Sequence, residues 1–384
     1  MSEYQYYEFQ AIDHPLSEEQ MRELRSYSTR ARITSTSFVD DYAFGSFKGD
    51  NDAWMDRYFD AFVYLANWGT RILKLRLPSR LLDLSAANLY CGARNLLARE
   101  KDGRVIVTFL SDDEAGGEWV QGEGWLSSLI PVRAEIARGD LRALYLGWLL
   151  CVQKDRLGGK ETEPPVPAGL GQLSASLESL VEFLRSDSDL LAVAAQASSP
   201  LPKIEVDYQE ITAWVERLPT GEKNDLLARL VLGENSSLAA VILRRFLEQR
   251  EAALGHGGKP IKRRTVRRLL DAAEEYGAER LRIEAQKEAE EKALSEREAA
   301  AARARYLDEL GGREPQLWAE VERLVMTKRP ASYDEAVELL KDLRDLATRK
   351  QDSGFQLRFR SLRAILMRRP ALMERMRNAG LKFS

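Results

Sequence analysis

Residues 262–310 read KRRTVRRLLDAAEEYGAERLRIEAQKEAEEKALSEREAAAARARYLDEL. The segment contains no proline and a single glycine, Gly277, and nearly all of its residues are good helix formers. Gly311 and Gly312 follow it, and glycine is common where a helix ends. The segment therefore predicts one continuous helix, which would be about 70 Å long at 1.5 Å per residue.

The large apolar residues of this segment lie at its two ends. They occur between Val266 and Leu281 and again between Tyr306 and Leu310, whereas residues 284–303 offer little beyond alanines and Leu294. A helix that is polar all round either bridges two bodies through solvent or is held by side-chain pairs four residues apart. We therefore expect an exposed strut, with the composition of a coiled-coil helix, between an N-terminal mixed domain and a C-terminal helical domain.

Length and composition are those of a globular protein with more than one domain. The chain has 384 residues, of which 44% are hydrophobic and 30% charged. Apolar runs, such as residues 144–152, are far shorter than the roughly 20 residues that cross a bilayer. The N-terminus does not resemble a signal peptide. We expect a cytoplasmic protein without a membrane contact.

Cysteine and histidine are scarce. Cys91 and Cys151 lie in apolar surroundings and far from each other, which is typical of buried free thiols in a cytosolic protein. His14 and His256 are equally far apart in the sequence. We therefore expect neither a metal site nor a cofactor.

The pattern of elements predicts an α+β fold, in which an N-terminal mixed α+β domain is followed by a mostly α-helical C-terminal half with the long helix. The expected parts are an α+β head (1–155), a linker (156–173), a helical middle (174–258), the long strut helix (259–312) and a helical-hairpin tail (313–384).

Apolar periodicity and turn residues predict the individual elements. Strands are expected at 4–12, 33–42, 70–77 and 104–110. Helices in the head are expected at 17–27, 52–68, 84–99, 125–137 and 141–152. Later helices are expected at 173–196, 204–218, 222–232, 236–253, 315–326, 332–346, 355–367 and 371–379. The motifs Ser17–Gln20 and Ser332–Glu335 have the pattern of capping boxes that open helices.

The C-terminal part carries a family resemblance. Its motifs are Leu317-Trp318, Lys328-Arg329-Pro330, the run YDEAVELLKDLRDLA at 333–347, and Pro370-Ala371-Leu372 with Arg375 and Ala379-Gly380-Leu381. This segment resembles the C-terminal helical tail of bacterial SWIM zinc-finger proteins. SWIM domains bind zinc through a CxC…CxH cluster that this sequence lacks, so the resemblance implies a helical interaction tail and no zinc site. The N-terminal region resembles that of bacterial proteins, which implies bacterial origin.

Charge is unevenly distributed along the chain. Residues 241–384 hold 32 Lys+Arg and 24 Asp+Glu, a balance of +8, and the remaining residues hold 25 and 36, a balance of −11; together these give the net charge of −3. Such asymmetry suggests either an anionic partner for the C-terminal half or contact between the two halves.

Two basic clusters are candidate nucleic-acid-binding sites. The candidate residues of the first basic cluster are Lys262, Arg263, Arg264, Arg267 and Arg268, and those of the second basic cluster are Arg358, Arg360, Arg363, Arg368 and Arg369. Guanidinium groups on one helical face can neutralise phosphates and release counterions. The alternative is that these charges pair with the acidic N-terminal half or are simply solvated. The positive end of the long helix repels cations at its start, which favours an anion nearby.

One acidic loop is a candidate enzyme site. Asp112, Asp113 and Glu114 follow the strand expected at 104–110, a place where carboxylates often bind hard metal ions, although a solvated turn is the alternative. The run Gly255–Pro260 lacks the first glycine and the Ser or Thr of a phosphate-binding loop, and a flexible turn fits it better. No arrangement typical of nucleophilic catalysis is recognisable.

Three functional hypotheses follow. The preferred one is a non-catalytic cytoplasmic interaction or scaffold protein with a protein partner. The first alternative is a nucleic-acid-associated protein that binds phosphates through the basic helical clusters. The second alternative is an enzyme with an acidic site near Asp112 and Asp113.

Overall fold

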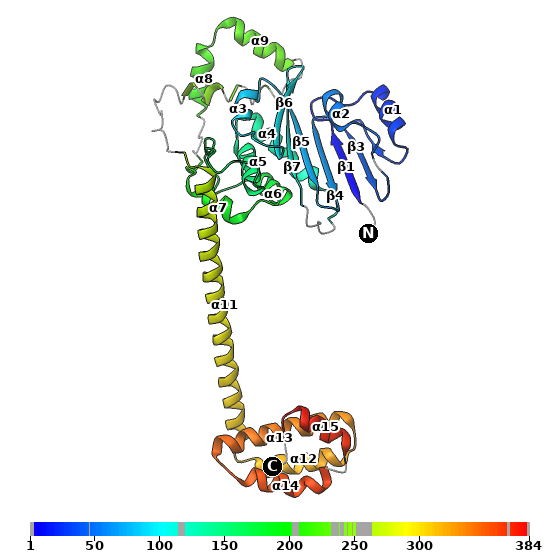
Figure 1. The fold of residues 1–384 in the computed structure, drawn as a ribbon, viewed down its shortest axis with the longest axis vertical. Helices are drawn as coiled ribbons and strands as arrows, with labels where there is room; N and C mark the ends of the chain where they lie inside the picture. Colours follow the sequence, from blue (N-terminus) through cyan, green and yellow to red (C-terminus); the bar gives the residue numbers. More distant parts are fainter. Residues whose placement is uncertain are drawn as a thin grey trace. The chain divides into compact units, whose positions relative to one another are not determined.

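A computed structural model describes the chain over residues 4–45, 47–113, 120–201, 207–231, 263–366 and 369–381, together with positions 238, 242–243, 245–247 and 249–250; for 363–366 it describes the backbone alone. The chain divides into two compact units, which we call the head unit (Met1–Arg280) and the tail unit (Leu281–Ser384). Both are drawn in Figure 1.

The head unit is built on one antiparallel sheet, which has seven strands within the described residues, in the order β2-β3-β1-β4-β5-β7-β6. Each pair of neighbouring strands is antiparallel. The strands are β1 (Gln5–Gln10), β2 (Arg32–Ile33), β3 (Ser37–Tyr42), β4 (Ala61–Ala66), β5 (Arg71–Pro78), β6 (Leu96–Lys101) and β7 (Arg104–Ser111).

Helices cover both faces of this sheet (Figure 1). The helices that cover the sheet or connect its strands are α1 (Glu18–Tyr27), α2 (Asn51–Arg57), α3 (Leu84–Asn88), α4 (Trp125–Ala137), α5 (Arg142–Gln153), α6 (Ala175–Leu184) and α7 (Ser188–Gln196). Alternate residues of β4 show the two layers. Val63 and Leu65 belong to the core beneath α4, α5 and α6, whereas Phe62 and Tyr64 belong to an aromatic core beneath α1 and α2.

The predicted helix at 52–68 is wrong. α2 ends at Arg57, and β4 begins at Ala61 in the centre of the sheet. Every residue of β4 is buried, because both faces of the sheet are covered. A strand that is apolar on both faces shows no alternation of apolar and polar residues. Its periodicity therefore does not distinguish it from a buried helix, and the aromatic residues of β4 also fitted a helical spacing.

Two further predicted helices are interrupted. Within 84–99 the chain forms only the short α3 and then enters the edge strand β6. Within 173–196 it forms α6 and α7, because Arg185 takes a left-handed conformation (φ 56°) and Asp187 caps α7 by accepting from two backbone amides. The predicted capping box at Ser332 is also wrong, because α13 already begins at Pro330.

Other predictions are confirmed. The box at Ser17 is present, with its hydroxyl accepting from the Gln20 amide and the Gln20 side chain accepting in return. The expected strands at 4–12, 70–77 and 104–110 and the helices at 125–137 and 141–152 all exist within a few residues of the expected bounds. The strand expected at 33–42 is divided into β2 and β3.

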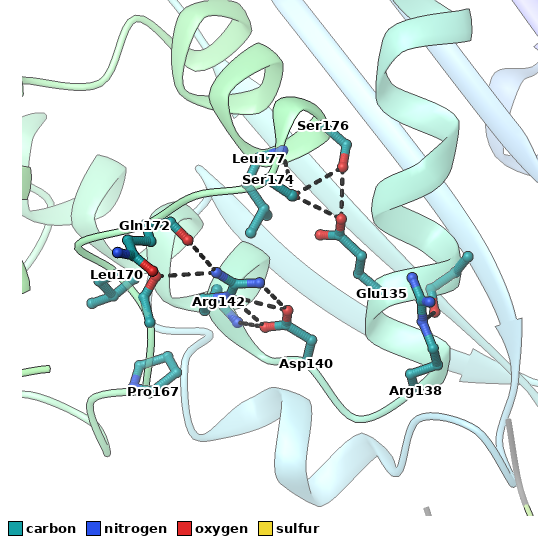
Figure 2. A network of polar contacts seen from close by, with 12 residues as sticks. Glu135, Arg138, Asp140, Arg142, Pro167, Leu170, Gln172, Ser174, Ser176 and Leu177 are labelled. Carbon is teal, nitrogen blue, oxygen red and sulfur yellow. Dashed lines mark hydrogen bonds and ion pairs between the residues drawn. The ribbon is translucent and has the colours of Figure 1, made fainter. Parts of the chain in front are cut away.

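Residues 156–173, for which composition predicted a linker, pack against the head unit. Leu157 and Leu170 are buried in the core of this unit. The Arg142 side chain donates to the carbonyl oxygen of Gly169 at 3.1 Å. It also donates to the carbonyl oxygen of Gln172 at 3.0 Å (Figure 2). Despite its proline and glycine content, this segment is therefore an ordered connection that packs on the core of the head unit.

Two more helices, α8 (Tyr208–Arg217) and α9 (Thr220–Val231), follow in the head unit. Trp214 and Leu218 form a small apolar cluster with Phe246, and the Trp214 indole donates to Gln249 at 2.7 Å. The helix expected at 236–253 lies partly outside the described residues, and residues 251–262 lie entirely outside them.

The long helix is confirmed. α11 (Val266–Leu310) runs without a break for 45 residues. Its first turns contribute Val266, Leu269 and Ala273 to the core of the head unit. Every residue from 281 to 302 is exposed, so this span buries no side chain within the described part of the chain.

The tail unit contains four further helices within the described residues: α12 (Glu314–Met326), α13 (Pro330–Lys350), α14 (Gly354–Leu366) and α15 (Pro370–Asn378). They share one core around Trp318, Leu340, Phe359 and Met376. The α+β fold class with a mostly helical C-terminal half is thus confirmed. Among the described helices, none has both the length and the apolar character needed to cross a bilayer.

Candidate functional site

Arg264 of the first basic cluster belongs to a buried network. Its guanidinium donates through Nε to Glu163 Oε2 (2.8 Å) and through Nη2 to Glu163 Oε1 (2.7 Å). Its Nη1 donates to the Val193 carbonyl at 3.0 Å. The Tyr145 hydroxyl donates to the same Glu163 carboxylate, which is 2% exposed. Arg264 therefore has a structural role. It pairs with an acidic residue of the N-terminal half, which is the alternative to nucleic-acid binding that the sequence left open.

The backbone around this pair is fixed as well. Thr162 and Thr265 form an antiparallel bridge, and the Val266 amide donates to the Glu161 carbonyl at 2.9 Å. The hydrogen bonds that Arg264 donates to Glu163 hold the pKa of Arg264 above its usual value. Burial, together with the Glu163 charge, raises the pKa of Tyr145, so that this phenol stays protonated. The network fixes the start of α11 on the head unit.

The neighbouring arginines point outward. Arg263, Arg267 and Arg268 are exposed. The Arg267 side chain is 82% exposed and lies 4.0 Å from Asp271, one turn further along α11. Lys262 lies outside the described residues. Three guanidinium groups at one helix start remain available to an anionic partner.

The second basic cluster lies in the tail unit. Arg358 is exposed and its guanidinium lies over the Trp318 ring, 5.5 Å from the centroid. Arg360 is exposed, and Arg369 is partly exposed just before α15. Arg363 belongs to α14, but its side chain lies outside the described residues, as does Arg368 entirely. The structure therefore shows side chains for only part of this cluster.

The acidic loop is held by arginines. Asp112 pairs with Arg94 and accepts from the Asn95 side chain at 3.3 Å, and Arg156 lies 4.0 Å away. Asp113 lies 3.7 Å from Arg185. Glu114 is outside the described residues, and in the part of the chain that is described no three His, Cys, Asp or Glu side chains gather as a metal site would require. These contacts favour a structural role for Asp112 and Asp113 over the hypothesis of an acidic enzyme site.

A second network, which the sequence did not reveal, joins α4 to the start of α6 (Figure 2). The hydroxyls of Ser174 and Ser176 both donate to Glu135 Oε1 at 2.7 Å. Nearby, Arg142 forms a bidentate pair with Asp140, at 2.7 to 3.0 Å. Serine and glutamate are ordinary on helix surfaces, so no local signal in the sequence distinguishes this network.

The tail unit contains an apolar cleft of about 330 Å³ between α12 and α14. Its lining residues are Ala319, Val321, Glu322, Arg323, Val325, Met326 and Leu362. Met326 is 64% exposed at the cleft. The Arg323 guanidinium pairs with Glu320 on the same helix. The sequence predicted a partner-binding tail, but it did not indicate these residues as a site.

Comparison with protein-family models, with curated proteins and with solved structures finds no match for this chain. The resemblance of the tail to SWIM proteins therefore stays a prediction.

Proposed function

We propose that the chain is a non-catalytic interaction protein whose tail unit binds an apolar segment of a protein partner. The supporting observation is the cleft between α12 and α14, at which Met326 is largely exposed. Methionine adapts to varied apolar surfaces and is common at binding surfaces of this kind. We also propose a bacterial origin and a cytoplasmic location.

The spacing on α12 fits recognition of a helix in a groove. Ala319, Glu322, Arg323 and Met326 lie three or four residues apart, on one face of the helix. Burial of an exposed methionine by a partner contributes about 1.5–3 kcal/mol. A cleft with apolar walls and charged residues at its edge suits an amphipathic helix.

Charge indicates the character of the partner segment. Residues 313–384 contain 16 Lys+Arg and 10 Asp+Glu, a balance of +6. Complementary charge steers association and selects partners. We therefore propose an amphipathic helix that carries acidic residues on its polar face.

The test is affinity capture with the full chain from its own cells, with nuclease added in one arm. We expect a protein to be retained after nuclease treatment and to be lost with Met326→Glu. Leu357→Glu is the matched control, because Leu357 is 69% exposed in the same unit but does not line the cleft. Loss of all captured proteins with nuclease, or equal capture by Met326→Glu, would contradict the proposal.

A second candidate function is nucleic-acid binding, which the exposed Arg263, Arg267 and Arg268 favour. Phosphate contacts by these groups would make binding weaken steeply with salt. The joint substitution of Arg267 and Arg268 by Gln should reduce this salt dependence. The absence of any shift of labelled DNA or RNA at low salt would eliminate this candidate.

A further inference from the structure

The head unit contains a cavity of about 280 Å³ on its α1/α2 side. It lies where the approach to α1 and the end of α2 meet β5 and the β6–β7 turn. The lining residues are His14, Pro15, Leu16, Gln20, Asp56, Arg57, Tyr58, Arg76, Lys101, Asp102, Arg104 and Ile106. Four of them are Arg or Lys and two are Asp, so the lining is basic.

The wall of the cavity contains a buried ion pair. Arg76 donates through Nε (3.1 Å) and Nη2 (2.8 Å) to Oδ1 of Asp60, which is 1% exposed. The other oxygen of Asp60 accepts from the amides of Ile12 (2.7 Å) and Asp13 (2.9 Å). Asp60 thus balances Arg76 and fixes one side of the cavity.

Arg104 forms a longer and weaker ion pair. Among the described residues its carboxylate partner is Asp60 at 3.7 Å, beyond hydrogen-bond distance, and that carboxylate already balances Arg76. Lys101 and Arg99 both pair with Asp56, at 2.9 and 2.7 Å. Within the described residues the cavity wall therefore has more positive than negative charge, and the Arg104 guanidinium has donors to spare.

We propose that this cavity binds a small organic phosphate, with Arg104 and Lys101 contacting the phosphate group. Arginine presents a fork of donors that matches phosphate oxygens. Pro15, Leu16 and Ile106 give the cavity an apolar part for the body of the ligand. The volume suits a small molecule rather than a polymer, since it lies at the lower end of ligand pockets.

Tyr58 lines the cavity as an uncharged residue, and its hydroxyl oxygen is buried. Burial, and then the neighbouring Glu23 carboxylate, raises the pKa of Tyr58 to about 12. The phenol is neutral at neutral pH even without this shift, so it does not repel an anion. This site is independent of the tail cleft, because all its residues belong to the head unit.

The test is isothermal titration calorimetry of the full chain with inorganic phosphate, glucose 6-phosphate and glucose. We expect binding of both phosphates that weakens with added NaCl, tighter binding of glucose 6-phosphate, and none of glucose. Arg104→Gln should raise Kd about tenfold or more, the usual effect of losing a charge-assisted hydrogen bond. Arg138→Gln, an exposed arginine of the same unit outside the cavity, should leave Kd unchanged.

A second variant guards against a folding defect in Arg104→Gln. Lys101 lies at the β6–β7 turn with its side chain 54% exposed, so Lys101→Gln should fold and still weaken phosphate binding. No heat with either phosphate compound would overturn the proposal. Equal affinity of wild type, Arg104→Gln and Lys101→Gln would overturn it too.

Discussion

Glu163 and Arg264 form a bidentate ion pair across 101 residues of sequence, with Nε–Oε2 and Nη2–Oε1 distances of 2.8 and 2.7 Å. The pair joins the stretch of linker-like composition to Arg264, two residues before the start of α11 at Val266. Glu163 is 2% exposed and the Arg264 side chain 24% exposed. The long helix is thus fixed to the head unit by a specific, mostly buried contact.

Glu163→Gln should destabilise the head unit by about 3 kcal/mol, because it leaves the partly buried Arg264 guanidinium without a counter-charge. Hydrogen exchange of residues 263–275 should accelerate, since this pair fixes the start of α11. Glu161→Gln is the control, because Glu161 is exposed two positions away. Unchanged exchange in Glu163→Gln would show that the pair does not fix the helix.

Gly277→Ala should fail to give the stabilisation that this change normally gives within a helix, about 1 kcal/mol. A Cβ at Gly277 would lie 2.7 Å from Asp189 Oδ2, and Asp189 pairs with Arg280 at 2.8 Å. The carboxylate would have to move away from Arg280. Chemical denaturation of the head unit measures the effect.

The effect of Gly277→Ala can also be measured in the variant Asp189→Ala, which lacks the carboxylate. In Asp189→Ala the obstacle is gone, so Gly277→Ala should stabilise by about 1 kcal/mol there. Equal effects of Gly277→Ala in both backgrounds would contradict the contact.

Acid should weaken the head unit through Asp60. Burial alone would raise the pKa of Asp60, but Arg76 and the amides of Asp13 and Ile12 hold it below its usual value. Its contribution is therefore fully present above about pH 4, the unfolded pKa, and is lost as the pH falls through the lower folded pKa. Denaturant midpoints measured from neutral pH to pH 3 should show this loss.

Asp60→Asn separates this contribution from general acid effects. The variant should lose about 3 kcal/mol at neutral pH, because Arg76 stays buried and unpaired, and its stability should depend less on acid. Asp102→Asn is the control, because Asp102 is exposed and lines the same head-unit cavity as Arg76; this variant should behave like wild type. An acid dependence in Asp60→Asn equal to wild type would contradict the assignment.

Ala293→Gly should cost about 1 kcal/mol of local helix stability, because residues 281–302 are exposed and buried contacts cannot compensate. Hydrogen exchange around position 293 should accelerate, while unfolding of the head and tail cores stays unchanged. Ala273→Gly is the contrasting variant, because Ala273 is 8% exposed in the head core and its loss should weaken that core. A lower midpoint for either core in Ala293→Gly would show that the span packs on something.

The sequence predicted the elements in which one local pattern was sufficient. α11 is long, rich in helix formers and free of proline, and β5 alternates, so both were predicted. β4 was missed because burial on both faces removes the alternation that marks a strand. The packing of 156–173 was missed because Leu170 and Glu163 are stabilised by partners far away in sequence.

The candidate sites follow the same logic. Counting charges found Arg263, Arg264 and Arg267, but only the structure shows that Arg264 pairs internally. The cavity at Arg104 draws on segments between His14 and Ile106 that no motif links. Single residues of common type become a site only through the sheet that brings them together.

The coiled-coil interpretation of α11 stays a prediction. Leu281, Ile283 and Leu294 are its large apolar residues between 281 and 302, and all three are exposed. Ile283 and Leu294 are separated by 11 residues, as a d and an a position would be, but Leu281 fits neither position in that register, so the three do not form a continuous a/d seam.

The most direct test of the proposed function is site-specific photo-crosslinking from position 326 in cells. A photoreactive residue in place of Met326 should give a discrete crosslinked protein that survives nuclease treatment, and one in place of Leu357 should give much less. No crosslinked species from position 326, or equal crosslinking from both positions, would contradict a partner in the tail cleft.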